Sequence, residues 1–363
     1  MRSNKYILDD KKREVEWDVL KGILMICVIA GHLDVHEYVR MYIYAFHMPL
    51  FFLISGYFYH PLINEDYIPK SSSKTNTFFW RLRRVISKKA YALLYPYLTM
   101  LILNYLAWII LYRPQNILSP IIHIFWKNTV DGLPIAGALW FLTALFFVFI
   151  FALFLDYIKT DRWLIISITM FAIIGSVINL LPFRLPLALD CAFEGTAFFE
   201  LGYYIKKKGL MTTFIQKLCK KWVVVISCIC LLISLPLIFL NGTVNFRDLE
   251  FACLPITWIN VILSLITFMG FSVILTKGMS KVAFFVSQEL QFIGRNTMIF
   301  MGFHQLARWG GIRVANRLLP GNSWGIAALR IFACVVCCII ACQIITWIFN
   351  LIRPLKKCLH ISI

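Results

Sequence analysis

Residues Glu16–Tyr59, EWDVLKGILMICVIAGHLDVHEYVRMYIYAFHMPLFFLISGYFY, decide the fold of this chain. They form two apolar segments, of which the first carries Lys21 and His32 and the second carries His47. An ionisable side chain at membrane depth is costly and usually has a function. The stretch therefore predicts membrane helices that enclose a polar site.

Helix geometry places the polar residues of the first segment on one face. At about 100° per residue, Lys21 and His32 differ by only about 20° in direction and stand roughly 16 Å apart along the axis. Asp18 falls on nearly the same stripe. One helix face is thus expected to carry a carboxylate, an ammonium and an imidazole.

Composition predicts an all-α, polytopic integral membrane protein. The 363 residues are 60% hydrophobic and 15% charged, mean hydropathy is +0.76, and apolar residues come in blocks about as long as a membrane helix. The net charge of +18 lies in short clusters between these blocks, which is typical of cytoplasmic loops. We therefore expect membrane lipids, and no nucleic acid, as partners.

About ten transmembrane helices are predicted, with both termini cytoplasmic, because this arrangement puts 26 of the 36 lysines and arginines on the inner side. No loop is long enough for a soluble domain, so residues 1–363 are expected to form a single membrane-embedded domain. It comprises a cytoplasmic segment 1–17, a bundle 18–352 and a cytoplasmic tail 353–363. The predicted spans are 18–36, 41–60, 90–112, 136–158, 163–182, 186–205, 222–240, 251–276, 292–310 and 323–352.

His32 is the sharpest catalytic candidate. An imidazole in a protein cavity can take a proton from an alcohol, although a histidine satisfied by a neighbouring helix is the competing interpretation. A metal is a further alternative, since His32 and His36 are four residues apart, but Asp34 would point about 200° away on a helix. We expect no metal. The cysteines at 334, 338 and 342 form a helical stripe of small residues and indicate packing.

Other charged groups keep two interpretations each. Lys21 can pair with Asp18, face a ligand phosphate, or extend to the cytoplasmic surface. Asp190 and Glu194, one turn apart in the sixth span, either pair with arginines such as Arg184, which we favour, or line a polar chamber. The remaining groups are basic: the cluster 81–89 suits membrane anchoring or a polyanionic ligand, and Arg308, Arg313 and Arg317 suit interfacial anchoring or contact with an acidic glycan.

Several motifs together resemble one family. The N-terminal pair comprises Asp18-x-x-Lys21-Gly22 with Gly31-His32, and the block FHMPLFFLISGY at 46–57. Weaker blocks are RLRR at 81–84 with YPY at 95–97, LWFL at 139–142, FELGY at 199–203, and IGRNT at 293–297 followed by His304. Over nearly its whole length the chain resembles the membrane-bound acyltransferase-3 family, specifically its sugar O-acetylase branch, typified by enterobacterial common antigen and fucose 4-O-acetylases. Lys21 stands where that family has an arginine, so the charge is kept and the bidentate fork is not.

The resemblance implies acyl transfer in the bacterial inner membrane, from cytoplasmic acyl-CoA, such as acetyl-CoA, to a sugar hydroxyl of an envelope polysaccharide or its lipid-linked precursor. His32 is the expected general base, with Asp18 and Lys21 as its catalytic companions. Direct transfer, an acyl-histidine intermediate and the oligomeric state all stay open. Expected donor-binding residues are Arg81, Arg83, Arg84 and Lys88; expected acceptor-binding residues are His36, His47, Ser55, Trp140, Glu194, Asn296 and His304.

Two rival functions remain. Intramembrane histidines and carboxylates also suit a proton-coupled transporter or flippase of an acyl group or a lipid-linked glycan, although no internal repeat is visible. Alternatively, the protein is a structural member of a polysaccharide synthase complex, in which buried polar groups hold helices together.

Overall fold

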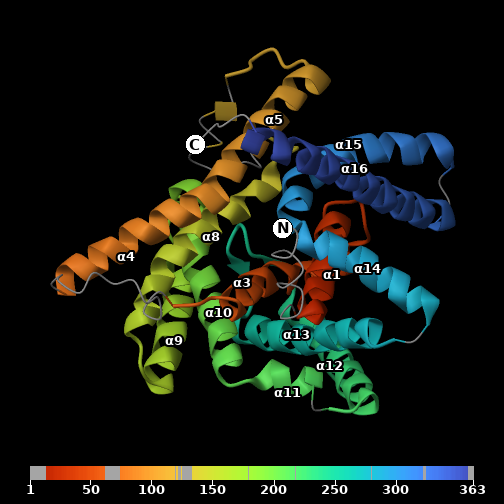
Figure 1. Cartoon of the computed structure of the whole chain (residues 1–363). Coiled ribbons are helices and arrows are strands. Elements are labelled where there is room, and N and C mark those ends of the chain that lie inside the picture. The colour runs from red at the N-terminus through yellow and green to blue at the C-terminus, as the bar shows by residue number, and fades with distance from the viewer. Residues whose placement is uncertain are drawn as a thin grey trace.

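The computed structural model describes residues 14–61, 74–118, 120, 121, 124, 133–178, 180–216, 218–278, 280–321 and 324–358. In this part of the chain nearly all residues are helical, and the only strands form one short antiparallel ribbon between α12 and α13 (Figure 1). The helical elements of the first half are α1 (Val15–Gly31), α2 (Glu37–Tyr44), α3 (His47–Tyr57), α4 (Lys74–Lys89), η3 (Ala90–Leu94), α5 (Tyr95–Tyr112), η4 (Gly137–Leu139), α8 (Trp140–Phe151), η5 (Ala152–Tyr157) and α9 (Asp161–Ile178). The second half holds η6 (Pro186–Ala188), α10 (Leu189–Lys207), α11 (Leu210–Gln216), α12 (Lys220–Asn241), β1 (Val244–Asn245), β2 (Glu250–Phe251), α13 (Leu254–Thr276), α14 (Lys281–Arg295), α15 (Thr297–Leu318) and α16 (Trp324–Cys358).

Seven helical segments in the described chain are long and apolar enough to cross a bilayer, so this is an all-α membrane protein. They are 37–57, 78–112, 137–155, 161–178, 220–241, 254–276 and 325–351. Each of the ten predicted spans contains a helix. Three of these helices fall outside the seven: α1 has only 17 residues, and α10 and α15 carry several charged residues. The count of ten and the orientation therefore stay predictions.

The surface of the bundle is apolar where a soluble protein would be polar. Leu240 on α12 is 77% exposed, Ile110 on α5 is 71% exposed and Phe332 on α16 is 68% exposed. Large apolar side chains in contact with water would be unfavourable, but hydrocarbon accommodates them. By contrast, no large apolar side chain of α1, α3 or α10 is exposed, so these three helices form the interior of the bundle.

Reciprocal glycine contacts bring the interior helices unusually close together. A Cβ on Gly22 of α1 would lie 2.1 Å from the carbonyl oxygen of Leu290 on α14, and one on Gly294 would lie 1.8 Å from that of Asp18. Helices α3 and α10 have the same relationship through Gly56 and Gly202. Since small residues allow backbones to approach in membranes, these pairs fix α1 and α3, which carry the predicted site.

The structure differs from the sequence prediction at several boundaries. The basic segment before the third span is itself helical: α4 extends away from the bundle and continues through η3 into α5 (Figure 1). Residues 281–291, predicted as part of a loop, are helical and belong to α14, which packs against α1. The second predicted span consists of two helices, α2 and α3, that meet at Ala45 and Phe46. The interpretation of the cysteine stripe is confirmed, because Cys334, Cys338 and Cys342 are all buried.

Candidate active site

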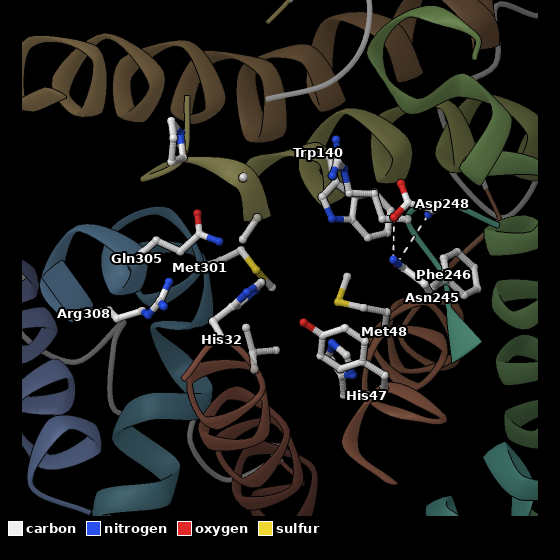
Figure 2. A pocket seen from close by; sticks show the side chains of 16 residues that line it. His32, His47, Met48, Trp140, Asn245, Phe246, Asp248, Met301, Gln305 and Arg308 are labelled. Atoms are coloured by element: carbon white, nitrogen blue, oxygen red, sulfur yellow. Dashed lines mark hydrogen bonds between the residues drawn. The ribbon is translucent and has the colours of Figure 1, made fainter. Parts of the chain in front are cut away.

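A cavity of about 370 Å³ lies at the end of α1 that carries His32 (Figure 2). Within the described residues, five parts of the chain form its wall: the end of α1, the junction of α2 and α3, the segment leading into α8, the turn of the β1–β2 ribbon, and α15. All of them lie where the sequence predicts the outer side of the membrane. The lining residues are Val28, His32, Tyr44, His47, Met48, Pro134, Gly137, Ala138, Trp140, Asn245, Phe246, Arg247, Asp248, Met301, Gln305 and Arg308.

His32 occupies the cap that ends α1. Its backbone N–H still donates to the helix, to Val28 O at 3.3 Å and Ile29 O at 3.2 Å, whereas the residues that follow leave the helix. Tyr44 reinforces this end, since its hydroxyl donates to the carbonyl of Gly31 at 3.3 Å. The end of α1 thereby holds the imidazole in the cavity lining, where it can contact a bound molecule.

Two further imidazoles surround His32. The ring of His304 lies 5.2 Å from that of His32, centroid to centroid and tilted by 35°. His304 Nδ1 is 2.9 Å from Phe300 O, and His47 Nδ1 is 2.7 Å from Ile43 O. A carbonyl only accepts, so in both residues we assign the proton to Nδ1 and the acceptor lone pair to Nε2. His304 Nε2 is buried and has no hydrogen-bond partner in the described chain.

One side of the cavity is rich in polar groups from α15, and the other side is partly aromatic. Gln305 and Arg308 reach from α15 on the side of His32 (Figure 2). Trp140 lies on the opposite side, where its ring stacks on that of Phe246 with centroids 6.2 Å apart and an angle of 18°. An aromatic wall facing hydrogen-bonding groups is the usual composition of a small-molecule site.

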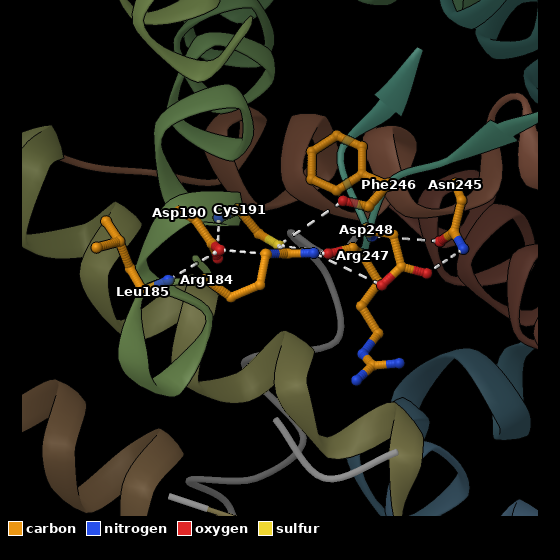
Figure 3. A network of polar contacts seen from close by, with 8 residues as sticks. All are labelled: Arg184, Leu185, Asp190, Cys191, Asn245, Phe246, Arg247 and Asp248. Carbon is orange, nitrogen blue, oxygen red and sulfur yellow. Dashed lines mark hydrogen bonds and ion pairs between the residues drawn. The ribbon is translucent and has the colours of Figure 1, made fainter. Parts of the chain in front are cut away.

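An ion-pair network anchors the ribbon turn that closes this second side (Figure 3). Arg184 donates to the carboxylate of Asp190 and to the carbonyl of Arg247, and its Nη1 lies 3.5 Å from Asp248. Asp248 also accepts a hydrogen bond from Asn245. Burial opposes the charge of the guanidinium, but its hydrogen bond to Asp190 and the neighbouring carboxylates outweigh that effect and raise the pKa of Arg184. The network therefore connects the cavity wall to the start of α10.

The backbone around this network is strained. Leu187, Ala188 and Leu249 have φ values of 55°, 56° and 57°, in the left-handed region that side chains with a Cβ rarely adopt. Such residues cost about 1 to 3 kcal/mol each and persist where the surroundings hold them. Hydrogen bonds flank these positions: Asp190 accepts from Arg184 and from Leu185 N–H, and Arg184 donates to the carbonyl of Arg247.

The opposite end of α1 carries a separate charged cluster. Lys21 Nζ lies 2.7 Å from Asp18, and Arg295 Nε donates to the same carboxylate at 3.2 Å. Of the predictions for Lys21, pairing with Asp18 is confirmed. Lys21 and Lys206 also approach the exposed ring of Phe58, at 6.0 and 5.7 Å. Asp18 and Lys21 do not line the cavity, so α1 separates them from it.

The predicted donor-binding residues lie on α4. Arg81 is buried with its guanidinium 5.7 Å from the ring of Tyr157, and that of Arg84 is 4.9 Å from the ring of Trp80. Arg83 and Lys88 are exposed. None of the four lines the cavity of His32. Their expected role in donor binding stays a prediction.

Of the predicted acceptor-binding residues, His47 and Trp140 line the cavity, and His304 packs against His32 without lining it. The other four lie elsewhere. His36 is exposed and caps α2 by accepting from Tyr38 N–H at 3.4 Å. The zinc alternative required His32 and His36 to lie on one helix, but α1 ends at Gly31, so they do not. Among described residues, no three potential ligands form a metal cluster. The other three predicted residues hydrogen-bond outside the cavity: Ser55 donates to Phe51 O, Asn296 donates to Phe292 O, and Glu194 accepts from Trp258.

Three polar features of the site were not predicted. Gln305, the turn residues Asn245 to Asp248, and the pairing of Arg295 with Asp18 all depend on contacts between distant parts of the chain. The ribbon turn offered one signal, since polar residues cluster in a short connection between two apolar spans. The predicted pairing of Asp190 with Arg184 is confirmed, whereas Glu194 is hydrogen-bonded to Trp258 instead.

The helical bundle and the imidazole-lined cavity define a polytopic membrane protein with a polar site. Comparison with known families identifies it further: a family model described as an acyltransferase domain matches residues 14–346. The chain therefore belongs to the acyltransferase 3 family and is a membrane acyltransferase. No curated protein and no solved structure matched it.

Proposed function

We propose that this protein is an O-acyltransferase of the bacterial inner membrane that acylates a carbohydrate. The donor is acyl-CoA, such as acetyl-CoA, and the acceptor is a sugar hydroxyl of an envelope polysaccharide or its lipid-linked precursor. The observation that carries this proposal is the position of His32, which stands at a polar cavity with an aromatic wall, in a chain of the acyltransferase 3 family. Aromatic and amide groups suit a sugar, and a thioester needs only a base to activate its attacker.

The proposed chemistry is a single acyl exchange. His32 accepts the proton of the sugar hydroxyl as its oxygen attacks the thioester carbonyl. The new C–O ester bond forms, the C–S bond breaks, and the proton passes from His32 to the departing thiolate of coenzyme A. His47 and Trp140 contact the acceptor, and His304 holds the ring of His32 in position.

Substitution of His32 tests this mechanism. Purified protein in detergent would be given radiolabelled acetyl-CoA and a polysaccharide acceptor, and label on the sugar would be measured. Loss of a general base lowers the rate by about 100- to 10,000-fold, so His32→Ala and His32→Gln are expected to be nearly inactive. His60→Ala is the control, because His60 is an exposed imidazole outside the cavity. Full activity of His32→Ala contradicts the mechanism, and acyl uptake only in sealed vesicles favours a carrier instead.

The donor is proposed to approach the end of α1 that carries Lys21. Coenzyme A is a polyanion, and Lys21 and Lys206 provide ammonium groups beside the exposed ring of Phe58. The α4 cations are the other candidate, represented by the exposed Arg83. We expect Lys21→Met to raise KM for acetyl-CoA about tenfold, in keeping with the loss of one charged contact, while Arg295 still pairs with Asp18. A rise in KM for Arg83→Gln alone would move the donor to α4.

A further inference from the structure

Arg308 is a cation of the cavity that has no counter-ion in the described chain. It lies one turn beyond His304 on α15, is partly buried, and lines the cavity that contains His32. No hydrogen bond or ion pair links it to another described residue, and its Nε is buried without a partner. Withdrawing part of a guanidinium from water is costly unless an anion or hydrogen-bond acceptor compensates.

Gln305 provides a second, independent sign that the cavity receives a polar molecule. Its side chain is 92% buried, because only 8% is exposed, and it lines the cavity one turn before Arg308. Its Oε1 is buried and accepts no hydrogen bond from a described residue. Buried amide oxygens are nearly always hydrogen-bonded in folded proteins, so this acceptor is suited to a hydroxyl of a bound molecule.

The carboxylate that also lines the cavity does not neutralise Arg308. Asp248 instead lies 3.5 Å from Arg184 Nη1 and accepts from the side-chain amide of Asn245. Figure 2 shows Asp248 across the cavity from Arg308, and Figure 3 shows it within the Arg184 network. Among the residues that the structure describes, no carboxylate therefore compensates the positive charge on the side of the cavity next to His32.

We propose that the acceptor is an acidic carbohydrate, and that Arg308 binds its anionic group while Gln305 accepts a hydrogen bond from one of its hydroxyls. The guanidinium fork matches a carboxylate or a phosphate. The anion is either a carboxylate of a sugar acid or the phosphate of a glycosyl phosphate. This inference rests on the proposed function, which makes the bound molecule the acceptor of the acyl group, but its binding can be measured without any acyl transfer.

Ligand binding by the full chain in detergent, without acyl donor, tests the inference. Glucuronic acid and glucose 1-phosphate serve as the anionic probes and glucose as the neutral one, with affinities measured by saturation-transfer NMR. We expect tighter binding of at least one anionic probe than of glucose. Loss of one charge-assisted contact predicts about 10- to 100-fold weaker binding of that probe by Arg308→Gln, with glucose unaffected. The two anionic probes distinguish the carboxylate from the phosphate.

A matched control separates the site from general surface charge. Arg313→Gln removes the same charge from the same helix, but Arg313 donates to Trp309 O at 2.9 Å and does not line the cavity. Its affinities are expected to equal those of the wild type. If Arg308→Gln elutes as an aggregate in size-exclusion chromatography, Arg308→Lys replaces it, because lysine keeps the charge and loses only the fork. Equal effects at positions 308 and 313, or no preference for an anionic probe, would overturn the inference.

The same variants distinguish this inference from the proposed function. His32→Ala is expected to bind the anionic probe as the wild type does and to transfer no acyl group. Binding that depends on Arg308 in a wild-type protein that acylates no sugar would support the inference and refute the proposed function. If transfer occurs and Arg308→Gln slows it equally for acidic and neutral acceptors, Arg308 serves the reaction itself and the inference fails.

Discussion

The imidazole rings of His32 and His304 lie 5.2 Å apart although the two residues come from opposite ends of the chain. His304 is held by its own helix, through Nδ1 and the carbonyls of Phe300 and Met301, and is fully buried. A fixed ring at this distance limits the orientations that His32 can adopt. His304 is therefore a positioning residue of the proposed reaction.

The effect of removing His304 follows from this role. We expect His304→Ala to lower kcat/KM about 10- to 100-fold, less than His32→Ala, because misplacement of a catalytic group is costly but does not remove it. In the double variant the loss is expected to equal that of His32→Ala alone, since residues that act as a unit are not additive. Radiolabel transfer by the four proteins measures this, and fully additive losses would contradict it.

Breaking the ion pair of Arg184 and Asp190 is expected to destabilise the protein. Arg184→Met leaves the carboxylate of Asp190, which is 1% exposed, without its cation. Loss of one partner of a buried pair costs 3 to 5 kcal/mol, and we expect about 3 because a third of Arg184 is exposed. Thermal unfolding in detergent measures the change. The double variant Arg184→Met/Asp190→Asn is expected to recover part of it, and a further loss in that variant would contradict the explanation.

Helix packing at Gly22 predicts a second effect on stability. Gly22→Ala places a methyl group 2.1 Å from the carbonyl oxygen of Leu290, so α14 must move away from α1. Overpacking of this kind costs about 1 to 3 kcal/mol. Gly310→Ala is the matched control, because a Cβ at Gly310 meets nothing within 4 Å and alanine favours the helix. We expect a lower unfolding midpoint for the first variant and no decrease for the second; equal midpoints would contradict the packing.

Cysteine labelling can test the predicted orientation. Cys219 is exposed between α11 and α12, in a segment predicted to be cytoplasmic. A membrane-impermeant maleimide is therefore expected to label Cys219 in inverted vesicles and not in intact cells. Cys219→Ser identifies the labelled site, because its loss removes that signal. Labelling of Cys219 in intact cells would reverse the topology and place the cavity of His32 on the cytoplasmic side.

The sequence predicted the helices and part of the site for a physical reason. Apolar segments of membrane length report directly on the bilayer, and ionisable residues within them report on function. His32 and His47 were singled out this way and Trp140 through the family motif at 139–142, and all three line the cavity. The ribbon turn and Gln305 escaped prediction because their place depends on contacts between distant segments. Predicted residues such as His36 lie elsewhere because α1 ends at Gly31, a boundary that hydropathy does not define.

The length of α1 between its two polar ends has a consequence for the size of the donor. Lys21 and His32 are held apart by a helix of fixed rise, packed by glycine against α14 and unable to shorten. If the phosphates bind at one end and the thioester reacts at the other, the length of α1 sets the distance that the donor must span between its phosphates and its thioester. A one-residue insertion in α1 would then change both the distance between Lys21 and His32 and the direction in which one side chain points relative to the other.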